Sequence, residues 1–199
     1  MRHKYETRGI VLARRSAGES HAQLAILTAD LGLLSARAVG VRLGKSKLAH
    51  ALVTYAESEL TLVYGREGWR VAGAVLGVNW FVQLASQQAR RRAARVTGLL
   101  LRLSPGEAPE AALYPVVTGF FAALSHENRD LDEGAELVAA SGILAALGFD
   151  DSTQGREALE VHPERSSTAA FSPEDLARAV AERERYVARI NRGIEASGL

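Results

Sequence analysis

Hydrophobic and polar residues alternate along most of the first 76 residues, which is the period of a β-strand with one buried face. Leu60 and Leu62, for example, flank the polar residue Thr61. Turns that contain glycine bound most of these runs. The pattern predicts five strands, at residues 9–15, 21–30, 33–42, 55–65 and 69–76.

The predicted strands follow one another through short connections, apart from one helix-like stretch at residues 46–53 between the third and the fourth strand. Five short strands with such an insertion are the plan of an OB-fold, a five-stranded Greek-key barrel. The periodicity alone fits an SH3-like barrel or a small sandwich as well. This region contains four aromatic residues that could stack on a ligand, Tyr5, Tyr55, Tyr64 and Trp69. We expect two or three of them to lie in the core.

Beyond residue 78 the hydrophobic period becomes helical. The clearest helix start is Ser172, a capping residue followed by Pro173 at the first helical position. We expect Pro115 to kink or divide its helix, Asp130 to cap the next helix, and Gly148 to end it. The predicted helices occupy residues 80–103, 109–125, 132–148 and 172–199.

These patterns predict an α+β chain in which an N-terminal five-stranded OB-fold barrel is followed by an all-helical C-terminal domain. We place the barrel domain at residues 1–78 and the helical domain at residues 79–199. The helical domain contains an irregular, polar segment at about residues 150–171.

Charge divides the chain more sharply than the net value of +1 suggests. Residues 1–104 hold 16 lysines and arginines against 6 acidic residues, a net +10, whereas the remainder holds 8 against 17, a net −9. A strongly basic half attracts polyanions whatever the overall charge. The N-terminal half is therefore expected to bind nucleic acid.

Several function classes are disfavoured by composition. The chain has no cysteine, and its five histidines are scattered, so we expect no metal and no cofactor. The serines beside His21 and His126 lack the glycine pattern of a nucleophile elbow, so we expect no catalytic residue. No run reaches the roughly 18 apolar residues of a membrane helix, and no signal peptide is visible, so we expect a cytoplasmic, nucleoid-associated protein with no membrane partner.

The segment "GVRLGKSKL" at residues 40–48 resembles a phosphate-binding P-loop. The P-loop pattern requires glycine at position 39, where this chain has Val39. A P-loop domain also needs a parallel sheet with crossover helices, and here strand follows strand. We therefore expect this segment to be a basic loop at the rim of the barrel, not an ATP site.

The basic residues of the N-terminal half form the candidate nucleic-acid site. They lie on the first and third predicted strands, in the loop after the third, in the hairpin between the last two, and on the first long helix, where two of them share one face. Because few aromatic side chains accompany them, we expect binding to rest on phosphate contacts and to depend strongly on salt. The candidates are Arg14, Arg15, Arg37, Arg42, Lys45, Lys47, Arg66, Arg70, Arg91 and Arg95.

Residues 8–52 resemble the N-terminal domain of the RecO family of recombination mediators. The resemblance rests on an opening strand that ends in basic residues, a Gly-Glu-Ser turn at residues 18–20, the run "TADLGLLSARAVGVR" at residues 28–42 and the lysines of "KSKL" at residues 45–48. Many members of this family carry a four-cysteine zinc module before the last helix. This chain has no cysteine there.

The resemblance implies a non-enzymatic DNA repair protein that binds single- and double-stranded DNA and anneals complementary strands. It also implies binding to RecR and to the tail of single-stranded-DNA-binding protein, and indirect action on RecA. The residues that it assigns to DNA are Arg14, Arg15, Arg37, Arg42, Lys45 and Lys47. Two alternatives remain open at this point: a barrel that binds another protein without DNA, and a nucleotide hydrolase.

Overall fold

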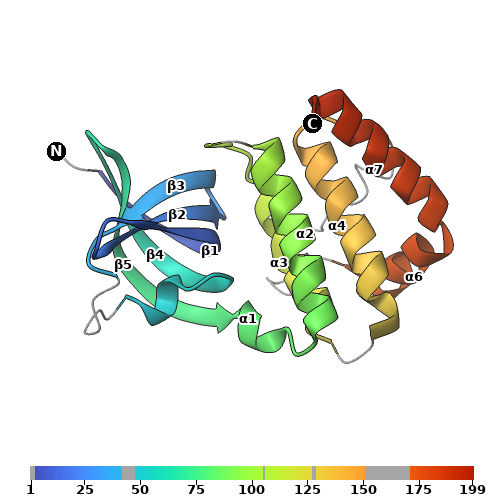
Figure 1. The fold of residues 1–199 in the computed structure, drawn as a ribbon, viewed down its shortest axis with the longest axis horizontal. Helices are drawn as coiled ribbons and strands as arrows, with labels where there is room; N and C mark the ends of the chain where they lie inside the picture. Colours follow the sequence, from blue (N-terminus) through green and yellow to red (C-terminus); the bar gives the residue numbers. More distant parts are fainter. Residues whose placement is uncertain (1–2, 42–47, 105, 127–128, 151–170) are drawn as a thin grey trace. The chain divides into compact units, whose positions relative to one another are not determined.

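A computed structural model describes residues 3–41, 48–104, 106–126, 129–150 and 171–199 of the chain. Strands form its N-terminal part and helices its C-terminal part (Figure 1). The predicted α+β class, with a five-stranded N-terminal sheet and C-terminal helices, is therefore confirmed. Among the described residues, no helix is long and apolar enough to cross a membrane.

The five strands close into a barrel in the order β1-β2-β3-β5-β4. β3 and β5 run parallel, and every other neighbouring pair is antiparallel. The third strand is shorter than predicted, because the chain turns after Ala38 and Gly40 takes a φ of 68°. The strand bounds are β1 Lys4–Ala17, β2 His21–Thr28, β3 Gly32–Ala38, β4 Ala56–Gly65 and β5 Gly68–Asn79.

The interior of the barrel is filled by the alternating hydrophobic residues of the strands. Leu24, Ile26 and Leu62 are fully buried, and Leu34 and Leu60 are nearly so. Each of these residues has a more exposed residue next to it on its strand, as expected when side chains alternate between the two faces of a sheet. The predicted helix-like stretch between the third and fourth strands is described only from residue 48, where it forms the short 3-10 helix η1 at His50–Leu52.

The helical part begins with two helices where the sequence predicts one. α1 spans Trp80–Gln83 and α2 spans Gln87–Leu103. Ser86 separates them, because its Oγ accepts the N–H of Ala89 at 2.9 Å and so caps the second helix. The single helix predicted at 172–199 is likewise divided, at Glu182, into α6 at Pro173–Ala181 and α7 at Arg183–Ser197.

Two further predictions about helix ends are wrong. α3 spans Leu113–Leu124, so Pro115 lies in its first turn, where helical N–H groups have no partner within the helix and proline causes no break. Asp130 lies in the 3-10 helix η2 at Arg129–Leu131, and α4 at Asp132–Ala146 begins without a side-chain cap.

The predicted signals at two other helix ends are confirmed. Gly148 ends the third predicted helix at a φ of 79°, and the N–H of Phe149 donates to the carbonyl of Leu144 at 2.8 Å. Ser172 caps α6 through the N–H of Asp175 at 3.1 Å.

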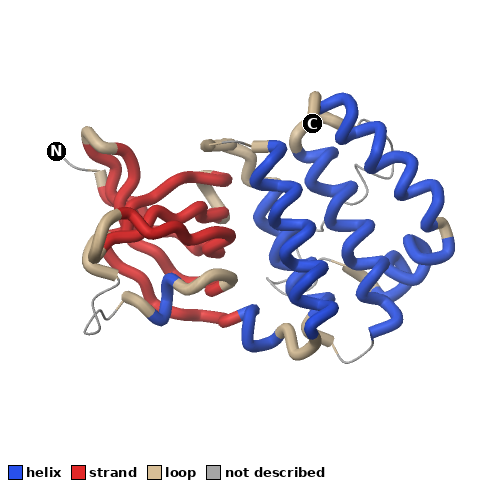
Figure 2. The backbone as a smooth tube through the Cα atoms, viewed as in Figure 1, coloured by secondary structure: helices blue, strands red, loops and turns tan. Residues whose placement is uncertain are grey.

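α4 is the central helix of the helical part (Figure 2). It packs against α2, α3, α6 and α7, and most of its residues are buried. At Gly134 the crossing with α6 is so close that a Cβ atom would lie 2.2 Å from the carbonyl oxygen of Leu176. Glycine is therefore required there for the two helices to approach.

The chain divides into two compact units, Met1–Gln83 with Gly106–Ala111, and Leu84–Pro105 with Ala112–Leu199. The domain boundary that we predicted after residue 78 lies just before the end of the first of these stretches. The return of residues 106–111 to the barrel unit was not predicted. Leu33 and Ala108 exchange two backbone hydrogen bonds of 2.8 and 2.9 Å, beside Gly32, which has a φ of 67°.

Candidate nucleic-acid interface

Three of the predicted arginines lie in one row across the outer surface of the barrel. Arg15 on β1 pairs in register with Gln23 on β2, and Gln23 pairs with Arg37 on β3. Arg37 in turn pairs with Arg70 on β5. Register partners point to the same face of a sheet, and neighbouring strands lie about 4.8 Å apart. Four adjacent strands therefore present Arg15, Arg37 and Arg70 as a band of positive charge, which we call the arginine row.

Arg14 does not belong to the arginine row, although it is next to Arg15 in the sequence. It is the register partner of the buried residue Leu24, so its side chain leaves the strand on the opposite face. It is half-buried, and its Nη1 donates to the carbonyl oxygen of Leu52 at 3.5 Å. Arg14 and Arg15, both predicted to contact DNA, therefore lie on opposite faces of β1.

The charges of the arginine row are only weakly neutralised within the barrel. Arg37 forms an ion pair of 3.4 Å with Glu67, but the Glu67 side chain is 86% exposed, and exposed pairs of this kind contribute little. The Nε atom of Arg37 is buried and has no hydrogen-bond partner among the described residues. Arg15 and Arg70 are exposed.

A hollow of about 870 Å³ lies beside one end of this row. Arg37, Arg66 and Arg70 line it together with Tyr64 and Trp69. The hollow therefore combines cationic and aromatic side chains around the hairpin that joins β4 to β5. Of the four aromatic residues of this region, Tyr55 is buried and the partly buried Trp69 packs against the core, whereas Tyr5 and Tyr64 are exposed. The expectation that two or three of them belong to the core is therefore confirmed at its lower number.

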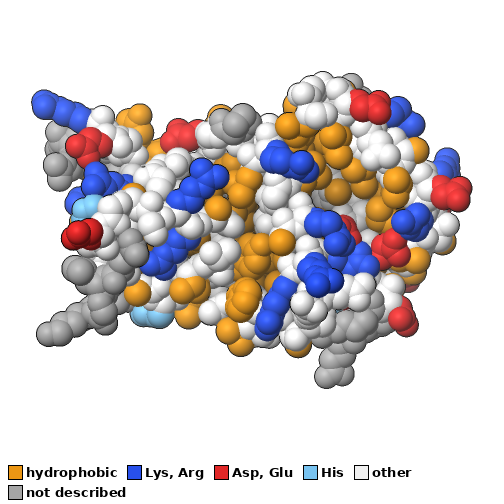
Figure 3. Space-filling view, viewed as in Figure 1, with side chains coloured by type: hydrophobic (Ala, Val, Ile, Leu, Met, Phe, Trp, Pro, Cys, Tyr) orange, Lys and Arg blue, Asp and Glu red, His pale blue; other side chains and the backbone are white. Residues whose placement is uncertain are grey.

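Three of the predicted site residues, Arg42, Lys45 and Lys47, lie outside the described residues. The remaining two, Arg91 and Arg95, lie on α2, in the helical unit. Figure 3 shows blue lysine and arginine side chains on the strand-built part and on the helical part alike.

Arg95 is bound to an acidic residue of its own unit. Its guanidinium donates to both carboxylate oxygens of Glu136 on α4, at 2.5 and 2.8 Å, and Arg92 binds the same carboxylate. Burial of Glu136 favours a higher pKa, but the hydrogen bonds and charges of Arg95 and Arg92 outweigh it and hold the pKa of this carboxyl below its ordinary value. The same hydrogen bonds raise the pKa of Arg95. Arg91 is exposed.

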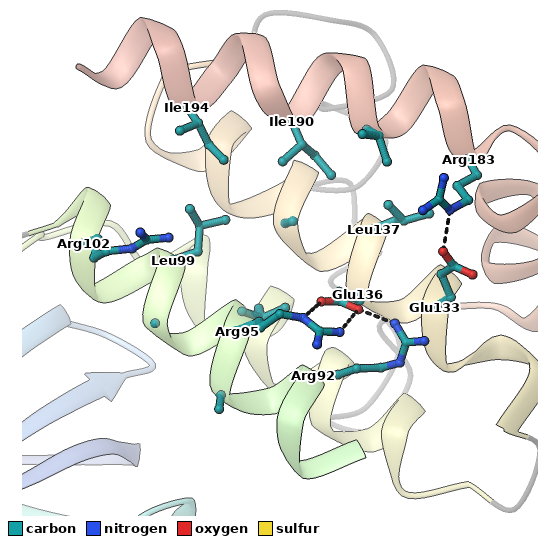
Figure 4. A pocket seen from close by; sticks show the side chains of 15 residues that line it. Arg92, Arg95, Leu99, Arg102, Glu133, Glu136, Leu137, Arg183, Ile190 and Ile194 are labelled. Carbon is teal, nitrogen blue, oxygen red and sulfur yellow. Dashed lines mark hydrogen bonds and ion pairs between the residues drawn. The ribbon is translucent and has the colours of Figure 1, made fainter. Parts of the chain in front are cut away.

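These ion pairs border a groove of about 850 Å³ between α2, α4 and α7 (Figure 4). Its apolar lining includes Leu99 and Leu137, which are almost fully buried, and the half-buried residues Ile190 and Ile194. Its charged lining consists of four arginines and two glutamates: Arg92, Arg95, Arg102, Arg183, Glu133 and Glu136.

The charged lining of the groove has an excess of positive charge. Arg183 donates to Glu133 at 2.7 Å, and Glu136 is shared by two arginines. Arg102 is exposed and has no ionic partner among the described residues. No sequence pattern predicts this groove, because α2 and α7 are far apart along the chain and only the tertiary packing brings them to α4.

Comparison with known proteins assigns the N-terminal part of the chain. Residues 1–71 match the family described as "Recombination protein O N terminal". These residues form most of the barrel, including the whole arginine row. The N-terminal part of the chain is thus similar to the N-terminal domain of the RecO family. The resemblance identified on residues 8–52 is thereby confirmed.

Curated relatives carry the name "DNA repair protein RecO". One, from Dehalococcoides mccartyi strain 195, is 31% identical over 115 residues, which cover 58% of this chain and 46% of the relative. Another, from strain CBDB1 of the same species, is 27% identical over 173 residues, which cover 86% of this chain and 67% of the relative. The chain thus spans less than half of the length of the first RecO relative and about two thirds of the second.

Proposed function

We propose that this chain is a non-enzymatic mediator of DNA repair and recombination whose barrel is an OB-fold that binds DNA. In this proposal it binds single and double strands, anneals complementary strands and helps to load RecA onto coated single strands. The arginine row is the observation that carries the proposal. The match of residues 1–71 to the RecO N-terminal family supports it.

The strand order supports the OB-fold assignment. A closed barrel ordered β1-β2-β3-β5-β4, with β3 parallel to β5, fits a five-stranded Greek-key barrel. OB-folds bind oligonucleotides across strands 2 and 3 and the loops at their rim. Gln23 on β2 and Arg37 on β3 are on that face, and the hairpin with Arg66 is one of those rim loops.

The arginine row suits a phosphate backbone better than a single small anion. Its members are distributed over four strands, so a chain of phosphates that crosses the strands meets them in succession. The Arg37 side chain is 43% exposed, so part of its guanidinium is open to a phosphate oxygen. Arginine also binds phosphate in a bidentate manner, with two parallel hydrogen bonds.

The test is a salt titration of the full chain with a fluorescent single strand, followed by anisotropy. We expect affinity to fall steeply with salt. The double variant Arg37→Ala/Arg70→Ala should bind more weakly by a similar factor for all sequences, with a salt dependence reduced by about 1.4 in log–log slope for two lost phosphate contacts.

Arg192→Ala is the matched control, because Arg192 is an exposed arginine on α7 outside the groove. Its binding should equal that of the unchanged chain. Absent or salt-independent DNA binding would contradict the proposal and favour the alternative, an OB-fold that acts as a scaffold for other proteins. Phosphate release from ATP would instead favour a nucleotide hydrolase.

We further propose that the groove of the helical unit receives the tail of single-stranded-DNA-binding protein. A tail that is acidic and apolar complements an apolar lining flanked by arginines. Arg102→Ala should weaken binding of a labelled peptide with such a tail, whereas Arg192→Ala should not. RecR is a proposed partner of the chain as well, and RecA an indirect one.

A further inference from the structure

Three aromatic side chains gather at one end of the barrel, beside the β4–β5 hairpin. The ring of Trp69 lies 5.1 Å from that of Tyr5 and 4.9 Å from that of Tyr64, edge to face in both cases. Tyr64 and Trp69 are register partners on β4 and β5, and Tyr5 lies on β1 opposite Leu62. These three residues, Tyr5, Tyr64 and Trp69, form what we call the aromatic cluster.

The aromatic cluster is only partly used for the packing of the barrel. Trp69 packs against the barrel core, but the Tyr64 residue remains 53% exposed and Tyr5 38% exposed. By comparison, the core residue Tyr55 of the same unit is only 8% exposed. Aromatic side chains that remain exposed to solvent at the edge of a site are well suited to bind a flat apolar ligand.

The charged residues near the aromatic cluster indicate which kind of flat ligand it could bind. Tyr64 and Trp69 line the same hollow as Arg37, Arg66 and Arg70. A ligand that fills this hollow must offer planar rings to the aromatic side chains and negative charge to the arginines within a few ångströms. Nucleotides of an unpaired strand have this combination, because each carries one base and one phosphate.

We propose that the aromatic cluster stacks on unpaired bases and so gives the barrel a preference for single strands over duplex. This inference rests on the proposed function, since it assumes that DNA follows the arginine row. In a duplex the bases are stacked on one another, and their faces are not accessible to Tyr64. Because every base has a π-face, the contribution is tolerant of sequence.

The experiment compares three labelled probes of equal length at one salt concentration: a single strand, an abasic strand with the same number of phosphates, and a duplex. Stacking of one base is worth about 5- to 150-fold in affinity, so the full chain should bind the single strand more tightly than the abasic strand by a factor in this range. Tyr64→Ala should lose most of that factor, while Tyr64→Phe should retain it. Neither variant should alter affinity for the abasic strand or the duplex.

Phe81→Ala provides the control, because Phe81 is 46% exposed on the same unit but does not line the hollow. It should bind all three probes as the unchanged chain does. A second measurement uses tryptophan fluorescence, which the base-bearing strand should quench. Trp69→Phe should abolish this quenching, since the other tryptophan, Trp80, is nearly buried and bonded to Glu57 at 2.8 Å.

The outcomes separate the two proposals. Salt-dependent binding with equal affinity for the abasic and base-bearing strands would overturn stacking and leave DNA binding by the arginine row intact. An unchanged preference in Tyr64→Ala would likewise overturn it. Failure to bind any of the three probes would overturn the proposed function and the stacking together.

Discussion

The barrel unit and the helical unit both carry arginines, but they use them differently. On the barrel, Arg15, Arg37 and Arg70 share one face. Within the described part of the chain, the one ion pair of this row joins Arg37 to the highly exposed Glu67. On the helical unit, Arg92 and Arg95 converge on one carboxylate that is only 19% exposed. A basic cluster in a sequence is therefore available to a polyanion only where the fold leaves its charges without close acidic neighbours.

The largest expected effect comes from charge reversal on the two units. Arg37→Glu/Arg70→Glu should lower affinity for a single strand at low salt by at least about 100-fold, because two phosphate contacts become repulsive. Arg91→Glu/Arg95→Glu should lower it by less than about tenfold, since Arg95 is already engaged by Glu136. Anisotropy titrations measure both.

Thermal unfolding followed by circular dichroism must accompany these titrations, because the helical double variant places a new carboxylate near Glu136. If the helical variant remained folded and bound DNA more weakly than the barrel variant, the contrast between the two units would be wrong.

A smaller effect is expected when the shared carboxylate is removed. Glu136→Gln should lower the free energy of unfolding by about 1–3 kcal/mol, because charge-assisted hydrogen bonds to two arginines are lost. It should also strengthen binding of DNA or of an acidic peptide to the helical unit, since Arg92 and Arg95 become available. Urea unfolding and anisotropy give the two results. Glu195→Gln, an exposed change on α7, is the control.

The same carboxylate gives a pH dependence with a defined sign. The pKa of Glu136 in the folded chain lies below its ordinary value of 4.5, so its ion pairs stabilise the fold fully above that value. This stabilisation is lost as the pH falls through the lower, folded-state pKa. Stability measured from pH 6 downwards should therefore fall less in Glu136→Gln than in the unchanged chain. An equal fall in both would show that other carboxylates dominate.

The smallest effect is expected at the exposed pair of the barrel. Glu67→Gln removes the carboxylate 3.4 Å from Arg37. Exposed pairs are worth at most about 1 kcal/mol, so single-strand affinity should rise by less than about fivefold and stability should hardly change. A larger gain would mean that Arg37 is held by Glu67 far more tightly than its exposure implies, and the two units would then resemble each other.

The positions of the strands could be predicted from the sequence better than the register between them. Strand alternation located all five strands, and even the opposite faces of Arg14 and Arg15 follow from the two-residue period. The register that aligns Arg15 with Arg37 and Arg70 could not be predicted, because it depends on the turns and on the closure of the barrel.

In the helical half, the helix ends and the contacts between helices were difficult to predict for a different reason. Apolar spacing is the same on either side of Ser86, so the break between α1 and α2 depends on a capping bond that competes with continuation of the helix. The pairing of Arg95 with Glu136 joins residues on two helices, and no local pattern reports it. The aromatic cluster was missed because hydrophobic rings were assigned to the core.

The close approach at Gly32 bears on how the barrel can be isolated. A Cβ atom at this position would lie 2.2 Å from the carbonyl oxygen of Ala108, so the segment 106–111 lies directly on the start of β3. A fragment cut after residue 83 would leave the N–H and C=O groups of Leu33 without the partners that Ala108 supplies. A fragment made to test the proposed DNA binding of the barrel must therefore keep this later segment together with residues 1–83.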